Sequence, residues 1–284
     1  MTGILFRKMH GAGNDFVVLD ARTDRRAAKA FTAPGARAIA DRWTGVGCDQ
    51  VVLIEPARNP GADAVMRIRN ADGEEAEACG NAARCVARLV MTEKGTDRCR
   101  LETLAGPIEA IREGPDRIRV DMGPAKTDWQ AIPLKGPADT LHLDLRAGTL
   151  RDAVAVSMGN PHAVFFVGDA EKVPLAEIGP RLENDAWFPE RANIGVAQIL
   201  SGNRLRLRVW ERGAGLTRAC GSGACAAAVA ANRRGLLGKE AEVVLDGGSL
   251  FVRIREDGHV LLSGPAALSF SGELPLDLVT EAAA

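Results

Sequence analysis

Two cysteines of this 284-residue chain lie in matching sequence contexts, and the match extends well upstream of each cysteine. Cys79 lies in Ala-Cys-Gly-Asn and Cys220 in Ala-Cys-Gly-Ser, and each follows a strand-like segment and precedes a run of small residues typical of a helix. Gly-Asn pairs that end at Asn14 and Asn160 precede the two cysteines at similar distances. We therefore predict an internal duplication, in which each of two related halves places one cysteine at the start of a helix.

The segments around the paired motifs predict a mixture of strands and helices in each half. Residues 65–69 and 204–209 alternate apolar with basic side chains, which is the period of two expected of half-exposed strands. The helices expected over 80–91 and 221–233 are rich in alanine, and a helix without a polar face is one that is surrounded by protein. We therefore predict an α+β fold of two pseudo-symmetric domains, each a mixed β-sheet or barrel wrapped around a central helix.

Glycine and proline residues indicate where the two domains meet. Residues 123–136 begin and end with glycine and contain two prolines, so this stretch is predicted to be a linker. We expect an N-terminal domain over 1–122 and a C-terminal domain over 123–266, with 267–278 returning to the first domain. The active site is expected in the cleft between the two domains.

The charge balance and the apolar segments exclude several classes of protein. Lys and Arg number 36 against 37 Asp and Glu, which gives a formal net charge of −1, and no basic stripe favours nucleic acid. No apolar stretch approaches the roughly 18 residues that cross a bilayer, and the first ten residues lack the apolar segment of a signal peptide. We expect a soluble, cytoplasmic protein with no nucleic-acid or membrane partner.

The six cysteines predict neither a disulfide framework nor a metal centre. Six cysteines in 284 residues without an export signal are too few for a disulfide scaffold. No Cys-x-x-Cys motif occurs and the four histidines are scattered, so no metal is expected, and no cofactor motif is visible either. Four of the cysteines are interpreted as small packing residues, namely Cys48, Cys85, Cys99 and Cys225.

A cysteine at the start of a helix lies beside unpaired backbone N–H groups and the positive end of the helix dipole. This environment can lower the pKa of a thiol from about 8.5 into the range in which thiolate is available at neutral pH. Gly80 and Gly221, directly after the two cysteines, allow an anion to approach the backbone closely. Two such helix starts facing one cavity would hold a single carboxylate, with a thiol on either side of the atom that bears it.

The α-carbon of an amino acid fits this arrangement. One cysteine, as thiolate, would remove the α-proton, and the other, as thiol, would return a proton to the opposite face. Because the α-proton is weakly acidic and no cofactor is expected, hydrogen-bond donors on the carboxylate would stabilise the carbanion in a closed cavity. The sequence therefore predicts a cofactor-independent racemase or epimerase.

Four longer motifs together resemble those of the diaminopimelate epimerase family, and the resemblance covers essentially the whole chain. It implies a duplicated α+β fold and the interconversion of LL- and meso-diaminopimelate without pyridoxal phosphate, on the route to lysine and peptidoglycan precursors. It also implies a homodimer. The motifs are His10-Gly-Ala-Gly-Asn-Asp-Phe16, Arg69-Asn-Ala-Asp-Gly-Glu-Glu-Ala-Glu-Ala-Cys-Gly-Asn-Ala-Ala-Arg84, Gly159-Asn-Pro-His162 and Glu211-Arg-Gly-Ala-Gly-Leu-Thr-Arg-Ala-Cys-Gly-Ser-Gly-Ala-Cys225.

The resemblance also implies roles for individual residues. Cys79 and Cys220 match the catalytic pair, and His162 and Glu211 match positions that tune the pKa of the thiols. The charges agree with a substrate that has a second charged end, because Arg212 can bind a distal carboxylate and Glu211 an ammonium group. The residues that match the substrate-binding set are Asn14, Gln50, Asn70, Gly80, Asn81, Asn160, Asn193, Glu211, Arg212, Gly221 and Ser222.

Three alternatives remain. A proline or hydroxyproline racemase on the same scaffold is ranked second, because Glu211 and Arg212 favour a substrate with a second charged end. A related isomerase that uses a carboxylate in place of thiols is disfavoured by the presence of both Cys79 and Cys220. A non-enzymatic protein that binds an anion at the two helix starts would not exchange the α-proton with solvent, and it offers no reason for two matched thiols.

Overall fold

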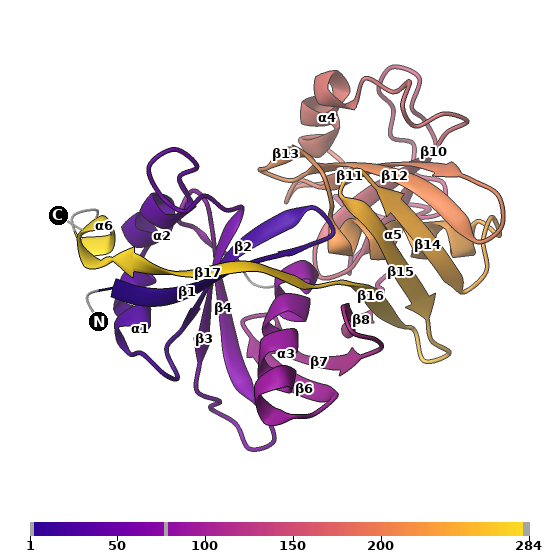
Figure 1. Cartoon of the computed structure of the whole chain (residues 1–284). Coiled ribbons are helices and arrows are strands. Elements are labelled where there is room, and N and C mark those ends of the chain that lie inside the picture. Colours follow the sequence, from indigo (N-terminus) through magenta and orange to yellow (C-terminus); the bar gives the residue numbers. More distant parts are fainter. Residues whose placement is uncertain (1–2, 77–78, 281–284) are drawn as a thin grey trace. The chain divides into compact units, whose positions relative to one another are not determined.

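The structure, a computed structural model, describes residues 3–76 and 79–280 (Figure 1). Glu77 and Ala78, which belong to the motif that leads into Cys79, lie outside the described residues. The chain divides into two compact units: unit 1 comprises Met1–Val120 with Gly264–Ala284, and unit 2 comprises Asp121–Ser263. Each unit has strands, a long buried helix and a hydrophobic core of its own.

The strands of unit 1 form a mixed sheet in which hairpins alternate with parallel crossovers. β1 pairs antiparallel with β2, and β2 runs parallel to β3. β3 pairs antiparallel with β4, which also pairs with the short β5; β4 runs parallel to β6, and β6, β7 and β8 follow antiparallel. The bounds are β1 (Gly3–Gly11), β2 (Asn14–Asp20), β3 (Gln50–Glu55), β4 (Ala64–Asn70), β5 (Glu75–Ala76), β6 (Arg98–Thr103), β7 (Gly106–Arg112) and β8 (Arg117–Pro124).

Unit 2 repeats this order element by element. β9 and β10 pair antiparallel, β10 runs parallel to β11, and β11 pairs antiparallel with β12. β12 pairs with the short β13 and runs parallel to β14, and β14, β15 and β16 follow antiparallel. The bounds are β9 (Val154–Ser157), β10 (Pro161–Phe166), β11 (Asn193–Ile199), β12 (Arg204–Glu211), β13 (Gly215–Thr217), β14 (Glu240–Leu245), β15 (Gly248–Ile254) and β16 (His259–Pro265).

Helices occupy the parallel crossovers of both units, as parallel strands require a long connection. In unit 1, α1 and α2 join β2 to β3, and α3 joins β4 to β6. In unit 2, α4 correspondingly joins β10 to β11, and α5 joins β12 to β14. The repeated order confirms the predicted α+β fold with internal duplication. The bounds are α1 (Arg26–Ala30), α2 (Ala33–Ala40), α3 (Gly80–Lys94), α4 (Leu175–Glu183), α5 (Gly221–Arg233) and α6 (Leu276–Thr280).

The two long crossover helices, α3 and α5, are each surrounded by strands of their own unit. α5 is buried along nearly its whole length and contacts β9, β10, β11 and β15. Its alanines leave room for close packing of the sheet against the helix. α5 has the predicted bounds, and α3 continues to Lys94, where Gly95 ends it with a left-handed backbone (φ 65°).

Residues 123–136 do not behave as a linker. Ile132 and Leu134 are buried in the core of unit 2, together with residues of β9, β10 and β11. The linker prediction is therefore wrong for this stretch, because its apolar side chains complete the core despite the glycines and prolines around them.

The strands β1 and β7 and the helix α4 were not predicted from the sequence pattern.

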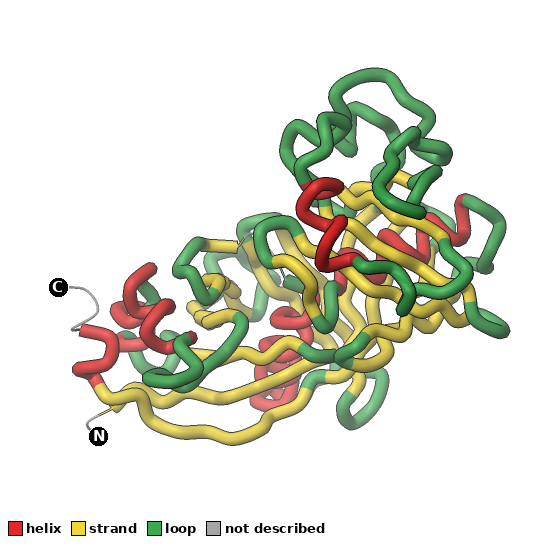
Figure 2. The backbone as a smooth tube through the Cα atoms, turned by 90° about the horizontal axis from the view of Figure 1, so that it is seen from above, coloured by secondary structure: helices red, strands yellow, loops and turns green. Residues whose placement is uncertain are grey.

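The C-terminal part of the chain completes unit 1. β17 (Ala267–Pro275) pairs antiparallel with β1, on the opposite side from β2. The last helix, α6, then contacts α2, and Figure 2 shows α1, α2 and α6 gathered at one end of this unit. Among the residues that the structure describes, no helix is both long enough and apolar enough to span a membrane.

Candidate active site

Both Gly-Asn pairs lie at hairpin turns. In unit 1, Ala12 (φ 52°) and Gly13 (φ 97°) form a two-residue turn between β1 and β2, and Asn14 is the first residue after it. Positive φ at both central positions matches the twist of a tight hairpin. In unit 2, Gly159 (φ 97°) lies in the turn between β9 and β10, and Asn160 follows. The two asparagines therefore emerge from equivalent turns.

The two cysteines cap the two long helices. Cys79 precedes α3 and Cys220 precedes α5, and both have an extended backbone (φ −148° and −134°) typical of an N-cap residue. Neither helix has an acidic residue in its first turn, so nothing there offsets the positive end of the helix dipole. Gly80 and Gly221 are the first helical residues, as the sequence predicts.

The thiol of Cys220 is enclosed by its own helix. The Gly223 N–H donates to Cys220 Sγ over 3.3 Å, and Ser222 Oγ lies 3.5 Å from the same sulfur. A Cβ atom at position 223 would lie 3.2 Å from this sulfur, so glycine leaves the space that the thiol occupies. Gly223 was missed in the sequence; its signal is a second glycine inside the first turn of the helix.

Burial raises the pKa of the Cys220 thiol well above its usual range, and the negative charge of Glu211 raises it further. The hydrogen bonds from Ser222 and from the backbone at Gly223 lower the pKa but do not reverse the shift. The expectation that the helix start lowers the pKa is therefore wrong for Cys220. Desolvation of a thiolate outweighs the helix dipole here, because the side chain is almost fully buried.

An asparagine from the hairpin binds the second helical residue in each unit. In unit 1, Asn81 Nδ2 donates to Asn14 Oδ1 over 2.5 Å. In unit 2, Asn160 Nδ2 donates to Ser222 Oγ over 3.5 Å. In each unit, this hydrogen bond connects the hairpin turn to the start of the helix that follows the cysteine.

The hydrogen bonds of unit 1 continue from Asn81 into the helix. Asn81 Oδ1 accepts from Arg84 Nη2 over 2.6 Å, and Arg84 is fully buried, with its Nε donating to the Pro265 carbonyl. Arg84 was not singled out in the sequence, although it ends one of the quoted motifs. A buried cation thus holds the side chain that follows Cys79 by two positions.

The next predicted residues lie at matching register positions. Gln50 pairs with Phe16 across β2 and β3, and Asn193 pairs with His162 across β10 and β11. Gln50 Nε2 donates to Asn70 Oδ1 over 2.9 Å, and Gln50 Oε1 is buried with no hydrogen-bond partner among the described residues. This atom is an acceptor open to a bound ligand.

His162 is buried and neutral. Burial lowers its pKa to about 3, and the positive charge of Arg212 adds to the effect. Its Nε2 lies 2.9 Å from Asn160 Oδ1, which can only accept, so Nε2–H donates. His162 therefore binds Asn160, Asn160 Nδ2 donates to Ser222 Oγ, and Ser222 Oγ lies beside Cys220 Sγ.

Glu211 is the last residue of β12, and Arg212 begins the tight connection to β13. Thr217 Oγ1 donates to Glu211 Oε1 over 2.5 Å. The Arg212 N–H donates to Asn193 Oδ1 over 2.9 Å, and Arg212 Nη1 donates to the Glu190 carbonyl over 2.9 Å. The guanidinium is exposed and the carboxylate half-buried, as suits groups that meet a ligand.

The structure thus places every predicted site residue, and it groups them within their own units. Among the described residues, no three His, Cys, Asp or Glu side chains are grouped so that they could hold a metal ion. The unit 1 group comprises Asn14, Gln50, Asn70, Cys79, Gly80 and Asn81. The unit 2 group comprises Asn160, His162, Asn193, Glu211, Arg212, Cys220, Gly221 and Ser222.

Comparison with known proteins identifies one family over most of the chain. The sequence model of the family described as diaminopimelate epimerase matches residues 6–127 and 154–269. A diaminopimelate epimerase of Rhodospirillum centenum is 57% identical over 269 residues, which cover 95% of this chain and 91% of the relative. One of Acidiphilium cryptum is 58% identical over 270 residues, with 95% of both chains covered.

A solved structure shares the fold at much lower identity. The hydroxyproline epimerase of Agrobacterium vitis, crystallised with trans-4-hydroxy-L-proline, aligns with a TM-score of 0.67 at 16% identity, over 97% of this chain and 93% of that one. At this identity the likeness shows the fold alone. The closer sequence relatives and the family match therefore carry the assignment to a family.

Proposed function

This chain belongs to the diaminopimelate epimerase family, and we propose that it interconverts LL- and meso-2,6-diaminopimelate by a two-base mechanism with Cys79 and Cys220. The reaction would supply the meso isomer for lysine and peptidoglycan precursor synthesis. The observation that carries the proposal is the repetition of one local arrangement in both units. Each unit has a cysteine at the N-cap of a buried helix and an asparagine bound to the second helical residue.

The backbone at each helix start supports the binding of the reacting carboxylate. The first-turn N–H groups of a helix have no partner within the helix, and the dipole favours an anion there. Gly80-Asn81 and Gly221-Ser222 provide these groups. Such donors stabilise the carbanion formed at the α-carbon, because the negative charge of the intermediate spreads onto the carboxylate oxygens. The proposal therefore requires neither pyridoxal phosphate nor a metal ion.

The two thiols would exchange roles in each turnover. The Cys79 thiolate takes the α-proton, so that the C–H bond breaks and an S–H bond forms, and the Cys220 thiol gives its proton to the opposite face of the carbanion. The product then leaves Cys79 as thiol and Cys220 as thiolate, and the reverse reaction restores the first state. The raised pKa of Cys220 supports this resting assignment, because it keeps that residue protonated without ligand.

The polar side chains around the cysteines support recognition of a substrate with two charged ends. Glu211 offers a carboxylate for an ammonium group, and the exposed Arg212 offers a guanidinium for a distal carboxylate. Gln50 Oε1 provides a buried acceptor for a substrate N–H. Asn14 and Asn160 each retain a second amide hydrogen and lone pairs beyond the hydrogen bonds already made.

We further propose that the enzyme acts as a homodimer in the cytoplasm. Three apolar side chains on the paired strands β1 and β17 support an association surface on unit 1, because Leu5, Leu268 and Phe270 are each about half exposed. A reducing compartment would keep both catalytic thiols in the required state. Light scattering of the purified protein, compared with a Phe270→Lys variant, tests the association.

The function is tested by α-proton exchange of both isomers in deuterated water without added cofactor. Wild-type protein is expected to epimerise diaminopimelate with incorporation of deuterium, and Cys79→Ala and Cys220→Ala are each expected to lose epimerisation. Cys99→Ala, which alters a buried cysteine in β6, is the matched control and should retain activity. Wild-type protein that turns over proline or hydroxyproline in preference to diaminopimelate would contradict the substrate assignment.

A further inference from the structure

Glu183 is a buried carboxylate that the proposed mechanism does not use. It is the last residue of α4 and only 6% exposed. A negative charge is unfavourable at the C-terminal end of a helix, where the dipole is also negative. A buried charge in such a position requires hydrogen-bond donors from other elements of the fold. The donors that bind Glu183 therefore indicate its role.

The partners of Glu183 lie on both sides of the Glu211-Arg212 pair. Glu183 Oε2 accepts from the Trp210 indole N–H over 2.7 Å, and Glu183 Oε1 accepts from the Gly213 backbone N–H over 2.9 Å. One carboxylate thus holds the residue before the pair and the residue after it. A third donor, Arg191 Nη1, reaches Oε1 over 3.1 Å from the exposed side.

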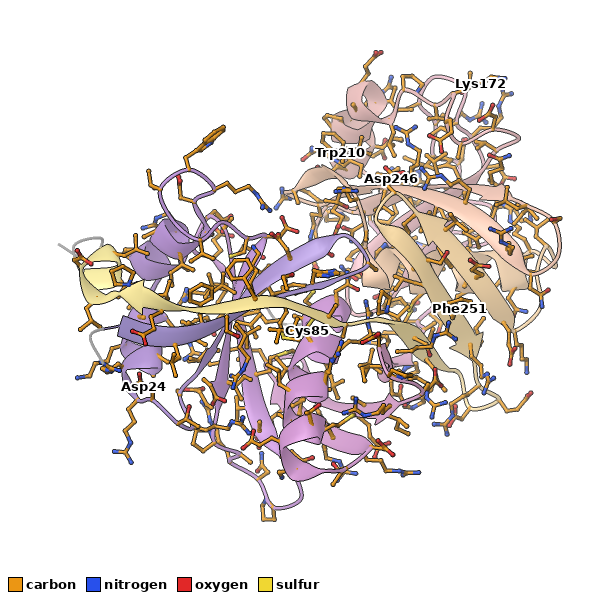
Figure 3. All side chains as sticks on the ribbon, viewed as in Figure 1. Asp24, Cys85, Lys172, Trp210, Asp246 and Phe251 are labelled. Carbon is orange, nitrogen blue, oxygen red and sulfur yellow. The ribbon has the colours of Figure 1, made fainter. Side chains whose placement is uncertain are left out.

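The Trp210 ring packs closely between α4 and the hairpin that carries Glu211 and Arg212. Trp210 lies beside α4 in Figure 3, and a Cβ atom at Gly179 of this helix would lie 2.5 Å from Trp210 Cδ2. A Cβ atom added at Gly215, on the other strand of the hairpin, would lie 3.6 Å from the far edge of the same ring. The indole therefore fills the space between helix and hairpin, and its N–H is directed at Glu183.

The loop after α4 and the first residue of β11 bind the same hairpin from a second direction. Asn193 Oδ1 accepts from the Arg212 backbone N–H, and the Glu190 carbonyl accepts from the Arg212 guanidinium. Residues 210–213 are therefore held at three points, namely the Trp210 indole N–H and the backbone N–H groups of Arg212 and Gly213. Glu183 provides two of them.

We propose that Glu183 is a positioning residue for substrate recognition: it fixes the hairpin so that Glu211 and Arg212 present their charges to the second charged end of the substrate. This inference rests on the proposed function. Glu183 binds Trp210, Gly213 and Arg191, and the Glu211 carboxylate beside Cys220 is held separately by Thr217, so the contribution of Glu183 lies in binding and not in proton transfer. Its loss should therefore raise KM and leave kcat close to its wild-type value.

The test is Glu183→Gln, assayed with diaminopimelate. Glutamine has one acceptor oxygen and one NH2 group, which only donates, so either the Trp210 or the Gly213 donor would face another donor. We expect KM to rise about tenfold while kcat stays within about twofold, the pattern of lost binding without lost chemistry. Glu177→Gln, the same change at an exposed position of α4, is the control and should match the wild type in both constants.

A second variant keeps the inference testable if Glu183→Gln folds poorly. Trp210→Phe preserves an aromatic ring against Gly179 but removes the indole N–H, and it should raise KM by a smaller factor. The double variant should raise KM by less than the product of the two single factors, because both changes remove the same hydrogen bond.

The outcomes separate the inference from the function on which it rests. Active wild-type protein with an unchanged KM in Glu183→Gln, or with kcat falling as much as KM rises, would overturn the positioning role and leave the proposed function intact. Wild-type protein that leaves both isomers of diaminopimelate unchanged would overturn the proposed function, and the inference with it.

Discussion

Phe16 and His162 occupy equivalent positions in the two units. Each lies two residues beyond a turn asparagine, and each pairs across a parallel strand with a predicted site residue, Gln50 for Phe16 and Asn193 for His162. Both side chains are buried. The duplicated framework thus places an apolar ring in unit 1 where unit 2 has an imidazole that orients Asn160.

This burial makes the stability of the protein depend on His162 below neutral pH. The pKa of His162 is about 3 in the folded state and about 6.5 when exposed, so between these values the unfolded chain binds a proton that the folded chain does not. Stability therefore falls as the pH decreases below 6.5, by up to about 1.4 kcal/mol per pH unit from this residue.

Urea unfolding of the wild type and of His162→Phe at pH 7.5 and 5.0 measures this dependence. The variant carries phenylalanine, as unit 1 does at the equivalent Phe16. Between pH 7.5 and 5.0 its free energy of unfolding should fall by about 2 kcal/mol less than that of the wild type. An equal loss in both proteins would mean that His162 is not the group responsible. The variant should also lose activity, because Asn160 loses the donor that orients it.

The carboxylate of Glu211 adds to the effect of burial on the pKa of Cys220. Burial and this negative charge raise the pKa of the thiol, so Glu211→Gln should lower the pKa, since it removes the charge and preserves the shape. Alkylation of Cys220 by iodoacetamide at pH 7.5, followed by peptide mass spectrometry, should be several-fold faster in this variant, because thiolate is the reacting form.

Glu177→Gln again provides the control, because it removes a carboxylate from an exposed position of unit 2. It should leave the rate of Cys220 alkylation unchanged. If Glu211→Gln also reacts at the wild-type rate, access to the buried sulfur limits the reaction and the carboxylate does not set the ionisation.

The sequence allowed the fold class to be predicted because its duplication is visible in short motifs. The two alanine-rich helices and the alternating strands have strong local patterns, and α5 begins and ends where predicted. β1 carries Arg7, Lys8 and His10 among its apolar residues, which hides the pattern of a strand that is paired on both sides. Pairing with β17, more than 250 positions away in the chain, cannot be inferred from local periodicity.

The site was only partly predictable for a related reason. Residue types with chemical function stand out in a sequence, but the residues that hold them do not. Arg84, Gly223 and Glu183 act through contacts with Asn81, Cys220 and Trp210, and each contact depends on how elements pack. The raised pKa of Cys220 likewise follows from burial, whereas the helix start alone favours a lower value.

Arg84 should contribute to stability through Asn81. Arg84→Met keeps an unbranched side chain but leaves the buried Asn81 Oδ1 without its charged donor, and we expect a loss of about 1–3 kcal/mol in the free energy of unfolding. Arg84→Lys should recover only part of this loss of stability. An ammonium group restores the charge, but it cannot reproduce the planar geometry with which the guanidinium binds both Asn81 and the Pro265 carbonyl. Arg98→Met, at an exposed position of β6, is the control in denaturant titrations. Equal stability of all three variants would exclude a supporting role for Arg84.

Gly179 tests the packing of α4 against the hairpin that carries Glu211 and Arg212. Alanine inside a helix is favoured over glycine by about 1 kcal/mol, but here its Cβ atom would lie 2.5 Å from the Trp210 ring. Overpacking of this kind costs about 1–3 kcal/mol, and a side chain before Pro180 further disfavours the helical backbone. Gly179→Ala should therefore be destabilised by about 1–2 kcal/mol in denaturant titrations.

Gly238→Ala gives the matched comparison for this last variant, because a Cβ atom there meets nothing within 4 Å. Its free energy of unfolding should stay within about 0.5 kcal/mol of the wild type. Displacement of Trp210 should also weaken its hydrogen bond to Glu183, so Gly179→Ala is expected to raise KM for diaminopimelate as Glu183→Gln does. A Gly179→Ala protein that is as stable as the wild type, with an unchanged KM, would show that the hairpin can shift without consequence for binding.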